Sequence, residues 1–259
     1  MALCEMHLGS SNALQKMISA TVILPEKKAG PFGVLYLLHG LSDDHTTWVR
    51  RTSIERYVEG LPLIVVMPNA ERSFYADSRS NPRAAFETMI VRDLVGFVDG
   101  MLNTRAERSS RALCGQSMGG YGAVKLALKH PDMFCAASSH SGALLFASRP
   151  ITARGPGSGP DDGWRREFEP IFGADPTGGP EDVLALAERA GRGSLPALRL
   201  DCGTEDFLLE DNRAAHARLK ELGLPHEYHE HGGAHEWGYW DAHVRESIDF
   251  VARAMGISA

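Results

Sequence analysis

Short, nearly continuous runs of apolar residues recur along the chain and end in glycine, proline or polar turn residues. Such runs are typical of strands buried inside a parallel sheet. We predict these strands at 33–39, 63–68, 111–116, 133–138 and 198–202. Alternation of apolar and polar residues predicts two further strands, 15–24, which Pro25 closes, and 226–231.

Apolar residues at helical spacing lie between these strands. The pattern predicts helices at 86–102, 119–130, 164–172, 181–190, 211–222 and 239–255. Three of these helices are followed by residues that typically end a helix, namely Pro131, Gly223 and Gly256. Because strands alternate with helices, we expect right-handed β–α–β units and therefore an α/β fold with a mostly parallel central sheet flanked by helices.

Residues 148–194 interrupt this alternation. The first part, 148–163, is rich in glycine and proline, so we expect it to be mobile. The second part carries Trp164, Phe168, Ile171 and Phe172, which either wall a pocket or only anchor the segment. Because the segment has too few apolar residues for a core of its own, we interpret it as a cap-like insertion in a single domain, 1–259.

The overall charge of the chain argues against one class of binding partner. The chain has 27 Lys and Arg against 33 Asp and Glu, a formal net charge of −6. This balance argues against nucleic acid, whose phosphates need clustered basic residues. No run of about 18 apolar residues occurs, so we expect no membrane span. The sequence does not determine the oligomeric state, and a homo-oligomer is one of the open alternatives.

The four cysteines, Cys4, Cys114, Cys135 and Cys202, form no CxxC pair and lie among apolar residues. Their spacing favours buried free thiols in a reducing compartment over a disulfide or a nucleophilic thiol. Residues 1–16 lack a basic patch followed by an apolar run, so we expect no secretory signal. Together these features predict a cytoplasmic protein.

The strongest chemical motif is Gly115-Gln-Ser117-Met-Gly119, which follows a predicted strand and opens a predicted helix. A serine in this strand–turn–helix setting is typical of a nucleophile elbow, where flanking glycines avoid clashes in a tight turn. The alternative is a purely structural turn.

A serine nucleophile needs a histidine as base and a carboxylate to orient that histidine. In this topology the acid and then the histidine follow the serine along the chain. Asp206 comes just after the predicted strand 198–202, and His235 lies in a glycine turn before the last helix. Glu205 and Asp211 are alternative acids, and His226, His229 and His231 are alternative bases.

The histidine-rich run 226–231 could instead bind zinc. It contains no HExxH motif, and neighbouring strand residues point to opposite faces, so a packed or exposed strand is favoured. We therefore predict no metal site and no cofactor. For the oxyanion of a tetrahedral intermediate, the expected donors are the backbone N–H groups of Met118 and of Leu41, which follows His39-Gly40.

These motifs together resemble the esterase D branch of the α/β-hydrolases, which includes S-formylglutathione hydrolases, tributyrin-type esterases and feruloyl or acetyl-xylan esterases. The matching segments are LLHGLSDDHTTW (37–48), VMPNA (66–70), CGQSMGGYGA (114–123), CGTEDF (202–207) and GGAHEWGYWD (232–241). Within this branch, the segments HGLSDDHTTWVRRTSIER (39–56) and HEWGYW (235–240) are most similar to tributyrin-type esterases.

The resemblance implies a serine carboxylesterase with Ser117, Asp206 and His235 as its catalytic triad, acting on a small-molecule ester. We expect hydrolysis of short-chain acyl esters through an acyl-serine. Hydrolysis of S-formylglutathione or of feruloyl or acetyl sugars, and acyl transfer, stay open as alternatives because one triad serves all of these reactions. A binding domain on a hydrolase scaffold is disfavoured, because such a domain would normally have lost a triad residue.

Overall fold

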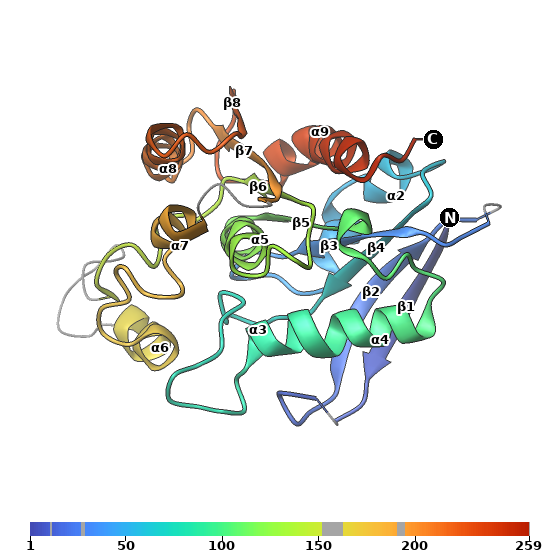
Figure 1. The fold of residues 1–259 in the computed structure, drawn as a ribbon, viewed down its shortest axis with the longest axis horizontal. Helices are drawn as coiled ribbons and strands as arrows, with labels where there is room; N and C mark the ends of the chain where they lie inside the picture. The colour runs from blue at the N-terminus through green and yellow to red at the C-terminus, as the bar shows by residue number, and fades with distance from the viewer. Residues whose placement is uncertain (11, 27–28, 152–162, 191–194, 259) are drawn as a thin grey trace.

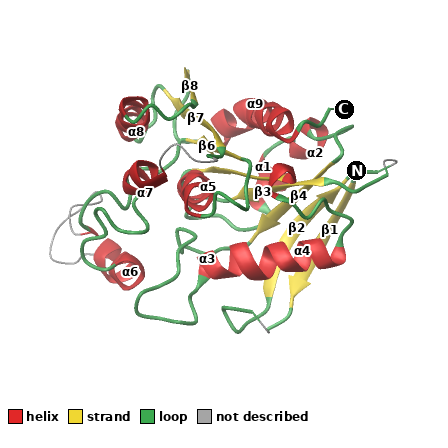
Figure 2. Cartoon of the chain, in the orientation of Figure 1, coloured by secondary structure: helices red, strands yellow, loops and turns green. Residues whose placement is uncertain are grey.

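The computed structural model of the protein describes residues 1–10, 12–26, 29–151, 163–190 and 195–258. An eight-stranded sheet runs through its centre (Figures 1 and 2). The strands are β1 (Ala2–Leu8), β2 (Ile18–Leu24), β3 (Gly33–Leu38), β4 (Leu63–Pro68), β5 (Arg111–Gln116), β6 (Ala136–His140), β7 (Ala197–Gly203) and β8 (Glu227–His231). Their order across the sheet is β1-β2-β4-β3-β5-β6-β7-β8.

The six strands β3 to β8 run parallel to one another, whereas β2 is antiparallel to both of its neighbours, β1 and β4. Every residue of β3, β4 and β5 is buried, which is why β3 and β4 have continuous apolar sequences and β5 has an apolar centre. The arrangement confirms the predicted α/β fold with a mostly parallel sheet. β1 was not predicted, because this edge strand is largely exposed and lacks an apolar run.

Helices cover both faces of the sheet (Figure 1). The first face packs against the core shared by α3 (Phe86–Thr88), η1 (Met89–Leu94), α4 (Val95–Met101), α5 (Met118–Lys129), α7 (Val183–Ala190) and α8 (Leu209–Glu221). The second packs against α1 (Thr47–Arg51), α2 (Ile54–Tyr57) and α9 (Trp237–Met255). The remaining elements are η2 (Arg108–Ser110) and α6 (Gly163–Phe172).

Three elements differ from their predicted form. The strand predicted at 15–24 begins only at Ile18, because 12–16 form a turn in which Gln15 has φ 52°. The predicted helix 86–102 contains a π-helical turn, η1, between two α-helical parts. The strand predicted at 133–138 begins instead at Ala136 and continues to His140. Its last residues, Ser139 and His140, are polar but completely buried, so hydrophobicity alone could not place its end.

The second part of the insertion docks onto the body of the protein. Phe168 and Phe172 on α6 are completely buried, and both rings contact Phe74. The Tyr121 hydroxyl on α5 donates a 2.6 Å hydrogen bond to the Glu181 carbonyl oxygen just before α7. The mobility expected of 148–163 falls mainly on 152–162, which lie outside the described residues.

All four cysteines carry free thiols, as predicted, but Cys4 is partly exposed whereas the other three are buried. Among the described residues, no helix has both the length and the apolar character that crossing a membrane requires.

Candidate active site

Ser117 lies at the turn between β5 and α5, with φ 54° and ψ −117°. Non-glycine residues rarely adopt this backbone conformation, and it is strained. A Cβ atom on Gly115 would lie 2.5 Å from the Gly119 carbonyl group, and one on Gly119 would lie 2.3 Å from the Leu38 oxygen. Both glycines are therefore required for the turn to approach β3. The Ser117 N–H donates to the His140 carbonyl oxygen at 2.9 Å, which fixes the turn against β6.

His235 approaches Ser117 from the turn between β8 and α9. Its Nε2 atom lies 3.0 Å from the Ser117 Oγ atom. The ring is held between the Phe207 ring, 4.5 Å away between centroids, and the Trp240 ring, 5.0 Å away. Gly233 has φ 138° in this turn, a conformation that favours glycine.

Asp206 lies on the other side of the imidazole, just beyond the end of β7. Its carboxylate oxygens lie 2.8 and 3.0 Å from His235 Nδ1, and the Leu208 N–H donates to it at 2.8 Å. Burial alone would raise the pKa of Asp206, but the hydrogen bond and charge of His235 outweigh it, so the pKa lies below its ordinary value. An ionised Asp206 accepts a hydrogen bond from His235 Nδ1–H, which leaves Nε2 unprotonated and able to accept the Ser117 hydroxyl proton.

The alternative acids and bases have other partners. Glu205 accepts the Gly233 N–H, and Asp211 pairs with Arg149. His226 contacts His216, His229 lies 3.6 Å from Glu227, and His231 lies 3.5 Å from Glu246. Among the candidates named from sequence, the structure brings Ser117, His235 and Asp206 into one hydrogen-bonded chain.

The two residues predicted to supply the oxyanion donors, Met118 and Leu41, come from the start of α5 and from the loop after β3. Met118 begins α5, so its N–H is one of the first-turn amides that have no acceptor within the helix. Leu41 lines the same pocket as Ser117. Its loop is fixed by His39, whose Nε2 accepts the Ala70 N–H at 2.9 Å while Nδ1 donates to the Gly40 oxygen at 2.7 Å. Burial lowers the pKa of His39, which favours this neutral form.

A pocket of about 990 Å³ opens in front of Ser117 and His235. Its walls combine aromatic rings with three charged side chains, Asp43, Arg51 and Glu236. The lining residues with aromatic side chains are Trp164, Phe207, Trp237 and Trp240. Trp164 therefore contributes to the pocket wall, whereas Phe168 and Phe172 on the same helix serve as anchors. Ile171 lines a separate, smaller pocket.

Two pairs of interacting side chains in the site were not identified from the sequence. The Gln116 side chain donates to Asp43 at 2.7 Å, and a Cβ on Gly40 would lie only 2.3 Å from that amide. This contact ties the loop carrying Leu41 to the elbow. Behind Ser117, His140 forms an ion pair with Asp201, and both side chains are completely buried. Neither pair matches a spacing motif, because each joins residues brought together only by the fold.

The family described as "Putative esterase" matches residues 11–249. An acetyl esterase of Caldicellulosiruptor saccharolyticus is 27% identical over 227 residues, which cover 85% of this chain and 83% of that protein. Two solved structures from Staphylococcus aureus are also similar, each 28% identical and aligned over 96% of this chain and 98% of the other. They are the substrate-bound fluorophosphonate-binding serine hydrolase FphF, with a TM-score of 0.84, and the apoenzyme of the S-formylglutathione hydrolase FrmB, with a TM-score of 0.82.

Proposed function

Because the chain belongs to this esterase family and is a carboxylic ester hydrolase of the serine esterase type, we propose that it hydrolyses small, short-chain acyl esters through an acyl-enzyme on Ser117. The observation that carries the proposal is the chain of hydrogen bonds from Ser117 through His235 to Asp206 at the wall of an open pocket. Each member has the geometry that its role requires.

In the acylation step, Ser117 Oγ attacks the carbonyl carbon of the ester while His235 Nε2 takes its proton. Asp206 stabilises the imidazolium that forms. The carbonyl oxygen becomes an oxyanion, which accepts hydrogen bonds from the Leu41 and Met118 N–H groups. The intermediate then collapses, the bond to the alcohol oxygen breaks, and His235 returns the proton to the departing alcohol.

In the deacylation step, a water molecule takes the place of the alcohol. His235 removes one proton from this water as its oxygen attacks the acyl carbon, and a second oxyanion forms between the same N–H groups. Collapse of this intermediate breaks the bond to Ser117 Oγ, which recovers its proton from His235. The products are the carboxylic acid and free enzyme, and no metal or cofactor is consumed.

A short acyl chain is supported by what borders the pocket. α6 is a ten-residue helix with Pro170 inside it, and its buried rings fasten it to the body of the protein. Such a docked helix does not provide the broad apolar face of a lipase lid. Trp164 reaches the pocket from this helix and limits its extent. We therefore infer a preference for acyl chains of a few carbons in dissolved esters.

Hydrolysis of a thioester, S-formylglutathione, is the second candidate. Its support is the similarity to the S-formylglutathione hydrolase from Staphylococcus aureus across 96% of this chain. The exposed Arg51 at the pocket also provides a cation that could pair with a peptide carboxylate.

One panel of substrates tests both candidates. We would measure kcat/KM for p-nitrophenyl esters from acetate to palmitate, for S-formylglutathione, and for acetylated and feruloylated sugars. The first proposal predicts a maximum at acetate to butyrate that exceeds the value for S-formylglutathione. A higher value for S-formylglutathione would favour the second candidate, and a maximum at palmitate would contradict both.

A further inference from the structure

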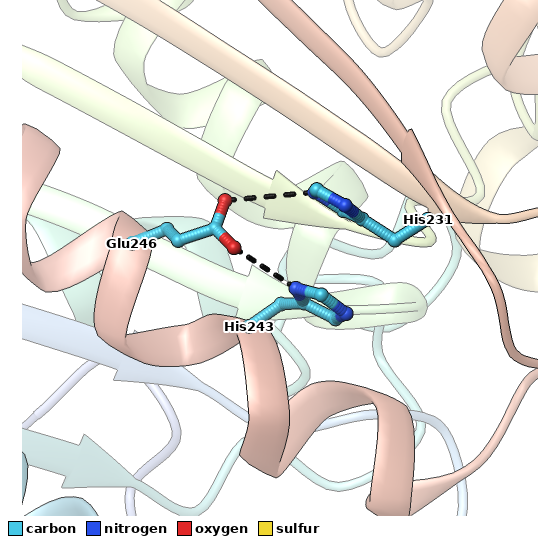
Figure 3. Close-up of side chains that lie close together, drawn as sticks. All are labelled: His231, His243 and Glu246. Atoms are coloured by element: carbon cyan, nitrogen blue, oxygen red, sulfur yellow. Dashed lines mark hydrogen bonds and ion pairs between the residues drawn. The ribbon is translucent and has the colours of Figure 1, made fainter.

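His231, His243 and Glu246 place their side chains together on the surface beside the end of β8 (Figure 3). His231 is the last residue of β8, and the other two lie one turn apart on α9. One donor atom from each residue lies within 4.8 Å of the other two. Figure 3 shows both imidazole rings directed toward the Glu246 carboxylate. From this arrangement we propose a binding site for a divalent transition metal, with Zn²⁺ as the best match.

The donor set fits such an ion. Two imidazole nitrogens and one carboxylate oxygen are ligands that Zn²⁺ accepts at about 2.0–2.2 Å, with water completing the tetrahedron. The Nδ1 atom of His243 lies 3.0 Å from Glu246 Oε1, and the Nε2 atom of His231 lies 3.5 Å from Oε2. Donors bound to one such ion are about 3–4 Å apart, and both histidine–carboxylate distances already lie in this range.

An unsatisfied donor supports the proposal independently. His231 Nε2 is buried yet has no hydrogen-bond partner among the described residues. A buried polar atom without a partner costs free energy, and a metal ion would satisfy it. The two imidazole rings stack with their centroids 4.1 Å apart, and they must tilt toward a common point for both nitrogen lone pairs to reach one ion.

The surroundings of the site hold the carboxylate in place. The Arg199 guanidinium donates to Glu246 Oε2 at 2.6 Å, which holds the carboxylate between the two imidazole rings, with Oε1 facing His243. The Tyr239 ring packs against His243 with its centroid 4.6 Å away. The exposed fractions of the two histidine side chains, 30% and 18%, leave a path for the ion from solvent.

A metal ion at this site would affect the turn that carries His235. His231 precedes the turn that carries His235, and His243 and Glu246 follow that turn on α9. A bound ion would therefore join β8 to α9 on both sides of His235 and restrain the turn. The expected role is to stabilise this part of the fold, and the ion takes no part in the ester chemistry. The proposal does not depend on the proposed function.

Zinc binding to the chelator-treated protein of residues 1–259 tests the site. Zn²⁺ would be titrated in competition with a chromophoric chelator, and the Co²⁺ form would be examined for the absorption of a tetrahedral site. We expect one equivalent to bind to the wild type. His231→Ala and His243→Ala should each lower the affinity at least tenfold, and Glu246→Gln should lower it less.

Three control variants separate this site from the other histidines. His229→Ala removes a neighbour on the same strand, His226→Ala breaks the other histidine pair, and His235→Ala removes the active-site imidazole. All three should bind Zn²⁺ as the wild type does. Thermal unfolding should show a rise in Tm of several degrees at about 100 times Kd for the wild type and the controls.

Two results would overturn the proposal. One is a wild type that binds Zn²⁺ no more tightly than the His231→Ala/His243→Ala double variant. The other is a loss of the bound equivalent in a control variant while His231→Ala and His243→Ala retain it. Because binding is measured directly, these outcomes are distinct from a failure of the proposed esterase activity.

Discussion

His140 and Asp201 form a completely buried ion pair behind Ser117, with 2.9 Å between His140 Nδ1 and an Asp201 carboxylate oxygen. The carbonyl oxygen of His140 is the acceptor for the Ser117 N–H. The Arg199 guanidinium also bonds to Asp201, and the Tyr239 hydroxyl donates to it at 2.9 Å. The elbow is therefore supported by a charged and hydrogen-bonded network and not by an apolar core alone.

This ion pair predicts a pH dependence of stability. Burial alone would lower the pKa of His140, but Asp201 outweighs it and raises the pKa to about 9. The ordinary value is 6.5, so the stabilisation is fully present below pH 6.5 and is lost as the pH rises through 9. We expect the free energy of unfolding to decrease over this interval by on the order of 3 kcal/mol.

His140→Gln is the matched variant, because glutamine can bond to Asp201 but does not titrate. Urea unfolding at several pH values between 6 and 9.5 should show a shallower pH dependence for this variant than for the wild type. Equal slopes for the two proteins would show that His140 is not charged in the folded state.

Asp206→Asn tests the orientation of His235. The amide keeps the shape of the carboxylate but removes its charge and favours the wrong histidine tautomer, so kcat should fall on the order of 10⁴-fold. Glu205→Gln is the neighbouring control and should change kcat only a few-fold, because Glu205 contacts the Gly233 N–H and not His235. If the larger loss occurred in Glu205→Gln, Glu205 and not Asp206 would be the acid.

Gly119→Ala tests the close approach of α5 to β3. The added Cβ would lie 2.3 Å from the Leu38 carbonyl oxygen, so one backbone segment must move. We expect a loss of stability of more than about 2 kcal/mol together with a loss of activity. Gly96→Ala in α4 is the control, because no atom lies within 4 Å of its Cβ position. That variant should gain about 0.5–1 kcal/mol from helix propensity. Similar effects on stability in the two variants would contradict the role given to Gly119.

Trp164→Ala tests whether α6 walls the pocket. Loss of this ring should raise KM for p-nitrophenyl butyrate and shift the preference toward longer acyl chains, with little change in stability. Phe168→Ala should instead destabilise the protein by about 3–5 kcal/mol, because its ring is completely buried beside Phe74. An unchanged chain-length profile in Trp164→Ala would mean that α6 only anchors the insertion.

The sequence was sufficient to predict the α/β fold, because the buried strands have continuous apolar sequences and the helices have a clear period. The elbow could also be predicted, because the close contacts around Ser117 leave no room for a side chain at Gly115 or Gly119, and these glycines are visible in the sequence. Polar residues in buried positions could not be placed. His140 ends β6 inside the protein, and its partner Asp201 lies 61 residues further along the chain.

The partners of the histidines in β8 could not be predicted from the sequence either. Successive strand residues face opposite sides, so the run 226–231 alone argued against a metal site. The partners of His231 are His243 and Glu246, which come from the next helix and reach it only in the folded protein. Such contacts between distant residues leave no spacing pattern to recognise.

Covalent labelling of Ser117 tests the central claim most directly. The protein of residues 1–259 would be treated with a fluorophosphonate, and the adduct would be located by peptide mass spectrometry. The same measurement would be made on Ser117→Ala. We predict one adduct, on Ser117, in the wild type, no adduct in the variant, and a loss of ester turnover on the order of 10⁴–10⁶-fold in a variant that unfolds at the same temperature. An adduct on another residue, or a Ser117→Ala variant that keeps a tenth of the wild-type rate, would contradict the account.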